Sequence, residues 1–180
     1  MENQAQTEPT FEIPFDVIEL PSKGVLYQGN ISHVKVEYLT AADENILTSP
    51  NLLQSGKVID YLLEQKIKQA GVSSSDLLVG DRNAIMIFLR ATGYGEMYPV
   101  KLTDPENGQE FEYEINLSEL KTKELGATPD EKGEFSFSLP RSKKEIKFRL
   151  LTAKDESEIL ARVEKRSKIV KGSVSNTLTY

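Results

Sequence analysis

The sequence predicts an α+β fold in which antiparallel β-hairpins pack around a buried central helix. Three observations lead to this class. Short runs of alternating apolar and polar residues flank turn residues, which is the pattern of hairpins. Residues 84–89 form an unbroken apolar run that, as a helix, must be covered on most sides. A strand-to-capped-helix element is repeated near both ends of the chain, at residues 34–44 and 146–156.

Composition restricts the classes of function. The 180 residues include 28 acidic and 22 basic side chains, a net charge of −6, which speaks against specific nucleic-acid partners and anionic membranes. Cysteine is absent, so disulfides and thiolate metal ligands are excluded. No apolar run is long enough to span a membrane, and the N-terminus lacks the layout of a signal peptide.

The chain divides into three segments by its apolar pattern. Residues 1–14 are largely polar and are expected to form a flexible N-terminal arm, and the polar residues 171–180 a flexible C-terminal tail. Residues 15–170 are expected to form a single α+β domain, which could consist of two related strand–helix halves.

The first elements are a hairpin and a capped helix. A strand at residues 17–20 precedes a second strand at 34–38, where apolar and polar residues alternate. Thr40 and Asp43 then have the spacing of a capping box, which should start a short helix ending near Leu47.

A second helix is expected after a break. Ser49–Asn51 contains a proline that should close the first helix. Residues 57–69 carry apolar side chains at helical spacing, and Gly71 is the expected stop.

The apolar run at 84–89 is expected to form the central helix. Asp81 is placed to cap its N-terminus. Gly93 and Gly95 suit the turn that ends it.

Two more hairpins and a final helix should complete the domain. Residues 100–102 and 111–115 alternate on either side of a loop that contains proline and Asn-Gly, a strong hairpin signal. Residues 135–139 and 146–150 predict a further hairpin, and residues 152–168 an amphipathic helix.

The repeated element matches without a gap over eleven positions. Residues 34–44 resemble residues 146–156 in alternation and in the Thr-x-x-Asp box that follows. Strand-to-helix junctions can converge on such sequences. Identity at several positions favours a duplication or a shared mode of docking.

The residues needed for familiar catalytic or metal sites are not present in usable patterns. His33 is the single histidine and has no cysteine or second histidine as a fellow ligand. Gly93-Tyr94-Gly95 is too short for a phosphate loop. The acidic residues between 104 and 114 lack the spacing of an EF-hand and suit the solvated face of a strand. We therefore predict no catalytic residue, no metal and no cofactor.

Four residues are candidates for a partner interface: Arg82, Arg90, Tyr94 and Tyr98. An arginine beside an apolar helix can anchor a partner or pair with a local acid, and the local pair is favoured. Tyr94, Tyr98 and Tyr113 could form an aromatic contact surface or cover the core, and core is favoured for at least two of them.

Several motifs together resemble the small central-hub baseplate protein family of T-even-type contractile-tailed bacteriophages. They are Leu20-Pro21-Ser22-Lys23-Gly24 with Tyr27, the Leu-Thr-x-x-Asp-Glu segment Leu39–Glu44, the Ile-Asp-x-Leu-Leu segment Ile59–Leu63, the segment Leu77–Tyr98, and a second Leu-Thr-x-x-Asp-Glu segment, Leu151–Glu156. Many sequences of this kind carry a Cys-Pro-x-Cys pair in a hairpin, where this chain has residues 103–108 without cysteine. The departure predicts that this chain has no zinc.

The resemblance implies a non-enzymatic structural component of the baseplate, at the hub or close to it. Its partners would be other baseplate proteins of the hub or inner wedge, with several copies of the chain in the assembly. It would reside in the virion, in the tail baseplate, and in the host cytoplasm during assembly. Two alternatives stay open: a hub assembly chaperone that is not retained in the mature virion, and a small carboxylate-dependent hydrolase.

Overall fold

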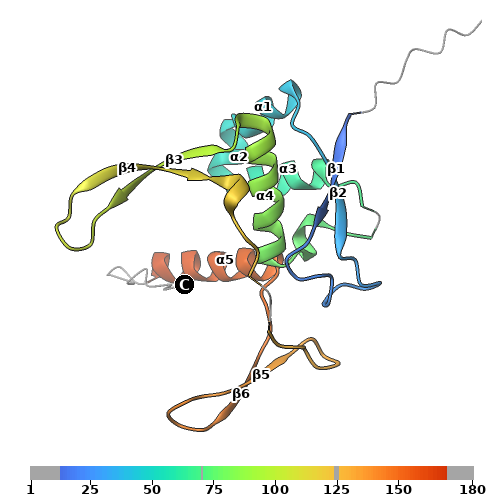
Figure 1. Ribbon diagram of the computed structural model, residues 1–180, viewed down its shortest axis with the longest axis vertical. Coiled ribbons are helices and arrows are strands. Elements are labelled where there is room, and N and C mark those ends of the chain that lie inside the picture. The colour runs from blue at the N-terminus through green and yellow to red at the C-terminus, as the bar shows by residue number, and fades with distance from the viewer. Residues whose placement is uncertain (1–12, 70, 124–125, 170–180) are drawn as a thin grey trace, which may run out of the picture.

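The computed structural model describes residues 13–69, 71–123 and 126–169. One hairpin (residues 15–37) and the helices between residues 41 and 94 pack together, and we name this part of the chain the body. Two further hairpins and a long last helix extend away from the body (Figure 1). Each hairpin is a separate two-stranded antiparallel sheet, so the predicted α+β class with antiparallel hairpins is confirmed. The predicted arm (1–14) and tail (171–180) lie almost wholly outside the described residues.

The first hairpin forms one wall of the body. It pairs β1 (Phe15–Glu19) with β2 (His33–Glu37), close to the predicted bounds. Val34 and Val36 are fully buried, as the alternation predicts. In the turn after β1, Gly24 has a φ of +75°, and a Cβ there would lie 2.5 Å from a backbone carbon of Ile31. Only glycine fits this turn.

Three short helices follow: α1 (Ala41–Leu47), α2 (Pro50–Ser55) and α3 (Val58–Lys66). The predicted capping box at α1 is present, with Thr40 and Asp43 bonded to each other's backbone groups. Pro50 starts a helix as well as separating it from α1, because a proline at the first helical position loses no hydrogen bond. Because Pro50 predicts only the end of α1, α2 is not predicted from the sequence.

The helix predicted at residues 57–69 corresponds to α3, and its predicted end at Gly71 is wrong. Helix α3 ends at Lys66, because Ile67 leaves helical geometry and forms an antiparallel bridge with Val36 of β2. Pairing with the neighbouring strand therefore ends the helix early. The polar segment that follows contains the 3₁₀ turn η1 (Ser74–Asp76).

The central helix is α4 (Val79–Tyr94), and both of its ends differ in part from expectation. It begins at Val79, so Asp81 lies inside the first turn and is not the cap. It stops at Gly95, whose φ of +91° suits glycine, as predicted. Gly93 lies within the helix instead of after it, and a Cβ there would approach Leu39 Cδ1 to 2.7 Å. This glycine therefore allows close packing of the helix on Leu39.

Helix α4 is covered along most of its apolar run and exposed at one position of it. Ile85 and Leu89 are buried in the core, which also contains side chains of β2 and α3. Ile87 is 36% exposed, whereas the other five residues of the run 84–89 are buried or partly buried, so the expectation that the apolar run is covered on most sides is confirmed. Phe88 is partly buried and stacks on Tyr38, with ring centroids 5.8 Å apart.

The two later hairpins leave the body. The first pairs β3 (Met97–Thr103) with β4 (Glu110–Asn116), and one 3₁₀ turn, η2 (Leu117–Glu119), follows. The second pairs β5 (Phe135–Ser138) with β6 (Glu145–Phe148). We name them the β3–β4 arm (residues 97–116) and the β5–β6 arm (residues 135–148). Both hairpins have the predicted strands, but they project from the body instead of packing around α4 (Figure 1).

The last helix, α5 (Ala153–Ile169), begins as predicted. The capping box at its N-terminus has both of its hydrogen bonds. The Thr152 N–H donates to Asp155 Oδ2 at 2.9 Å, and the Asp155 N–H donates to Thr152 Oγ1 at 3.2 Å. Both copies of the repeated element are thus a strand followed by a helix that begins with a capping box. Duplication as their cause stays a prediction. In the part of the chain that the structure describes, none of the helices combines the length and the hydropathy of a membrane span.

Candidate functional site

Asp81 joins the turn after β1 to the start of α4. Its Oδ1 accepts from the Ser22 N–H at 2.8 Å, and its Oδ2 accepts from the Ser22 and Tyr27 hydroxyls, each at 2.6 Å. The Tyr27 oxygen in turn accepts from the Leu78 N–H at 2.8 Å. Burial, and then the bond to Asp81, raise the pKa of Tyr27 far above its usual value. Two separated sequence motifs therefore meet in one buried polar network that fixes the body.

Arg82 pairs with acids of the same chain. Its guanidinium lies 2.7 Å from Asp60 Oδ1 on α3 and 3.3 Å from Glu156 Oε2 on α5. The side chain is mostly buried between these helices. The favoured local ion pair is what the structure contains, and Arg82 lies at the opposite end of α4 from the other three candidates.

Arg90, Tyr94 and Tyr98 lie together, and we name them the Arg90 cluster. The guanidinium carbon of Arg90 is 5.3 Å from each of the two ring centroids, a cation–π arrangement with both tyrosines. Arg90 also donates to the carbonyl of Gly95 at 3.0 Å. The Tyr94 hydroxyl donates to Glu44 of α1, and this bond raises the pKa of Tyr94. The cluster is thus held in place from within the chain.

The tyrosines lie at the surface and not in the core. Tyr94, Tyr98 and Tyr113 are 49%, 42% and 56% exposed. The expectation that at least two of them cover the core is therefore wrong. The reason is that the β3–β4 arm carries Tyr98 and Tyr113 away from the body.

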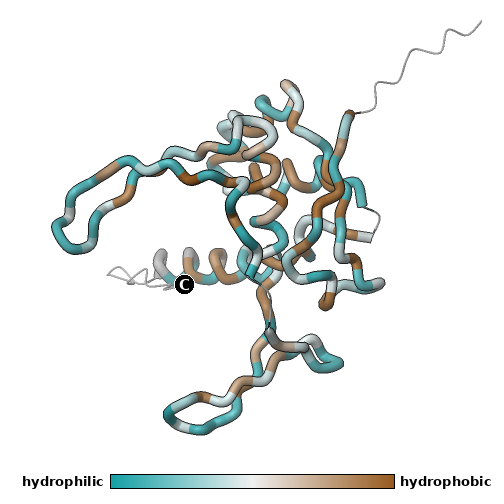
Figure 2. Tube along the Cα trace, viewed as in Figure 1, coloured by the Kyte–Doolittle hydropathy of each residue, from teal (hydrophilic) through white to brown (hydrophobic). Residues whose placement is uncertain are grey.

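One face of the β3–β4 arm is apolar and open. Because residues paired across a hairpin share a face, the register places Val100 opposite Tyr113 and Leu102 opposite Phe111 on the same side. We name these four residues the β3–β4 apolar face. Leu102, Phe111 and Tyr113 are each at least 42% exposed. Figure 2 shows apolar residues along both arms, outside the body.

The β5–β6 arm has the same design. Its register places Phe137 opposite Ile146 and Phe135 opposite Phe148. Phe135 is buried and stacks on Phe148, with centroids 5.6 Å apart. Phe137, Ile146 and Phe148, which we name the β5–β6 apolar face, are each at least 39% exposed.

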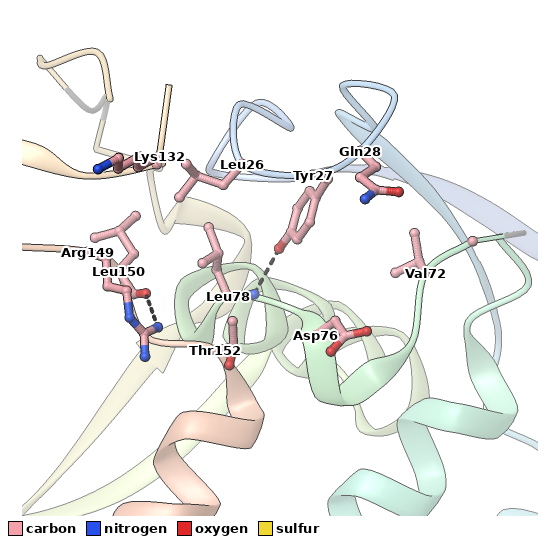
Figure 3. A pocket seen from close by; sticks show the side chains of 12 residues that line it. Leu26, Tyr27, Gln28, Val72, Asp76, Leu78, Lys132, Arg149, Leu150 and Thr152 are labelled. Atoms are coloured by element: carbon pink, nitrogen blue, oxygen red, sulfur yellow. Dashed lines mark hydrogen bonds between the residues drawn. The ribbon is translucent and has the colours of Figure 1, made fainter. Parts of the chain in front are cut away.

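A cleft of about 470 Å³ lies where the β5–β6 arm joins the body (Figure 3). Leu26, Tyr27 and Leu78 line it from the body, and Lys132 and Arg149 line it from the base of the arm. The charge of Arg149 is engaged, because its guanidinium pairs with both carboxylate oxygens of Asp155. No residue of the predicted interface lines this cleft.

Acidic side chains are spread over the surface instead of being gathered. Glu110, Glu112 and Glu114 lie exposed on the face of the β3–β4 arm opposite its apolar face. Within the described ranges, no three histidines or carboxylates are grouped closely enough to hold a metal ion. The arrangement is therefore one of exposed aromatic and apolar surfaces on a fixed body.

Arg90, Tyr94 and Tyr98 are predicted from sequence as interface candidates, a role that stays a prediction, whereas the two apolar faces are not predicted. Apolar and polar residues alternate along the strands of both arms, and this alternation predicts that their apolar sides pack around the central helix. The charge on the alternate positions does not decide between the two, since strands that bear charge on one side and aromatic residues on the other can lie on an open arm as well as over a core.

Comparison with known families gave one match. A family described as T4 bacteriophage base plate protein matches residues 13–136, which extend from before β1 to the start of β5. The match includes the body and the β3–β4 arm. The comparisons with curated proteins and with solved structures gave no match.

Proposed function

Because the chain belongs to the T4 bacteriophage base plate protein family, we propose that it is a non-enzymatic component of the baseplate hub or of its immediate surroundings. The family supports the coarser statement by itself: the chain is a structural protein of a phage tail baseplate. The hub position, the absence of catalysis and the choice of neighbours are our proposal.

The observation that carries this proposal is the Arg90 cluster. Arginine and tyrosine are the residue types that most often dominate binding energy at interfaces. Here the two rings and the guanidinium are packed on one another and are held by hydrogen bonds to α1 and to the end of α4; both tyrosines are more than 40% exposed, and Arg90 is partly buried. Such a surface loses little side-chain freedom when a partner binds. We propose that another baseplate protein, of the hub or inner wedge, binds there.

The proposed partners imply where the chain is assembled and where it remains. Several copies would be incorporated into each baseplate in the host cytoplasm, and the chain would then remain in the virion. Contact with neighbours would be its whole activity, with the body acting as a rigid support for the exposed surfaces.

Substitution at the cluster tests the proposal. Tyr94→Ala should lower the amount of the chain in purified particles about tenfold or more, the effect of losing an interface hot spot. Tyr61→Ala is the matched control, because Tyr61 is 49% exposed on α3, as exposed as Tyr94 on α4. The control should change incorporation by less than about twofold. Equal incorporation of Tyr94→Ala and the wild-type chain would contradict the proposal.

The nearest alternative is a hub assembly chaperone. Quantitative mass spectrometry of purified particles separates the two roles. A structural component occurs at a fixed ratio to the other baseplate proteins, whereas a chaperone is present during assembly and missing from finished particles.

A carboxylate-dependent hydrolase is the remaining alternative. It would need carboxylates gathered in one cleft, where burial and mutual repulsion raise a pKa. The acidic residues that suggested it, Glu110 to Glu114, are exposed along an arm. No observation among the described residues favours this role over a structural one.

A further inference from the structure

The two arms have opposite charge. The β3–β4 arm carries five acidic side chains and one lysine, a net charge of −4. The β5–β6 arm carries four basic side chains and one glutamate, a net charge of +3. Each arm also has an apolar face that is open in the structure.

We infer that the β3–β4 apolar face of one copy of this chain docks against the β5–β6 apolar face of a second copy. Each face supplies aromatic and aliphatic side chains for an apolar interface centre. The charges lie outside that centre. Glu110, Glu112 and Glu114 lie on the opposite face of the β3–β4 arm, and Arg141, Lys143 and Lys144 lie in the turn between β5 and β6, so they act on a neighbouring arm through the longer-range electrostatic field. The inference concerns contacts between copies, and it holds whether or not the chain lies at the hub.

The charges select this pairing over the alternatives. Two β3–β4 arms repel each other, as do two β5–β6 arms, whereas one of each attract. Charge complementarity of this kind raises association rates and suppresses wrong partners. The attraction between exposed charges must weaken with salt, because the Debye length falls from about 10 Å at 0.1 M to about 3 Å at 1 M.

The position of the arms makes the contact head-to-tail. The arms leave the body in different directions, so both faces are open to a neighbour (Figure 1). Because the contact joins two different surfaces, each copy keeps one unused face after the first contact: one copy keeps its β3–β4 apolar face and the other its β5–β6 apolar face. Such heterologous contacts build a ring where the rotation closes and an open chain where it does not.

The β3–β4 arm favours contact through its face over contact through its strand edges. Pro99 in β3 cannot donate a backbone hydrogen bond, and charged side chains occupy alternate positions of β4. Proline and charge on an edge strand are the features that prevent pairing of strand edges between molecules.

Charge reversal on the full chain tests the inference. The first variant, Glu106→Lys/Glu110→Lys/Glu114→Lys, changes the charge of the β3–β4 arm from −4 to +2. The second variant, Arg141→Glu/Lys143→Glu/Lys144→Glu, changes the charge of the β5–β6 arm from +3 to −3. All six side chains are exposed, so the fold should tolerate the changes.

Sedimentation velocity over a range of protein concentrations gives the measurement. The wild-type chain should form oligomers with a dissociation constant that rises with salt. Each variant alone should associate at least about tenfold more weakly, because both of its arms carry charge of one sign. A mixture of the two variants should associate again, and so should a single chain that carries all six substitutions.

The first variant also controls for overall charge. Its net charge is zero, six units above the wild-type value of −6, so weaker association of this variant cannot come from stronger repulsion between whole molecules. A second readout tests the apolar part: Phe111→Ser and Phe137→Ser should each weaken association. A wild-type chain that stays monomeric at all concentrations, variants that still self-associate, or a mixture that fails to associate would each overturn the inference.

Discussion

The buried carboxylate of Asp81 is the residue on which the body most depends. It is fully buried and accepts three hydrogen bonds from Ser22 and Tyr27. Removing the acceptor leaves these donors unpaired inside the protein, so Asp81→Ala should lower the free energy of unfolding by about 3 kcal/mol. Urea unfolding measures this value. Asp76→Ala, at an exposed aspartate near the same helix, should change it by less than about 0.5 kcal/mol, and equal effects would contradict the account.

The buried pair of Asp43 and Lys66 predicts a pH dependence. The two charges lie 2.5 Å apart and are nearly inaccessible to solvent. Burial alone would raise the pKa of Asp43, but Lys66 and the bonds from Thr40 outweigh it, and the pKa lies below its usual value. Asp43 therefore contributes stability above its unfolded pKa of about 4, and this contribution is lost as the pH falls through the lower folded pKa.

The variant Asp43→Asn isolates that contribution. At pH 7 it should be less stable than the wild-type chain by about 3–5 kcal/mol, because Lys66 keeps a buried charge without its partner. The difference should stay constant down to about pH 4 and shrink below it. Urea unfolding at several pH values provides the comparison. A difference that is as large well below pH 4 as at pH 7 would show that the pair does not act as described.

At the scale of elements, helix α4 should show one stabilising face. Ile85 is fully buried and Ile87, two residues later, is 36% exposed. Ile85→Ala should cost about 2–5 kcal/mol, the range for truncation of buried aliphatic side chains. Ile87→Ala should cost less than about 1 kcal/mol. Thermal or urea unfolding of this matched pair decides the point, and similar losses at both positions would mean that α4 is covered all round.

Local signals predicted the elements that local chemistry controls. The two Thr-x-x-Asp boxes start α1 and α5, and the loop with Asn-Gly joins β3 to β4. Elements set by distant residues were misassigned. Helix α3 ends early because Ile67 pairs with Val36, which no pattern near Gly71 reveals.

Asp81 shows the same limit. As a short acid before an apolar run it resembled a cap, but its carboxylate bonds to residues more than fifty positions away.

At the scale of the whole molecule, the chain is a fixed body with open surfaces on projecting arms. The sequence identified Arg90, Tyr94 and Tyr98, and the structure places them in one cluster, with Arg82 elsewhere in an internal ion-pair network. The apolar faces of the arms were not identifiable from sequence, because alternation shows that a strand has an apolar side and does not show what lies against it. In a baseplate protein, exposed faces of this kind are where neighbouring subunits are expected.

A density map of the assembled baseplate, with this chain assigned, would show directly what covers its exposed surfaces. We expect another baseplate protein to cover the Arg90 cluster, and the apolar faces of both arms to be buried in contacts between subunits. A map in which the chain is present while the cluster and both arms project into solvent would contradict this expectation.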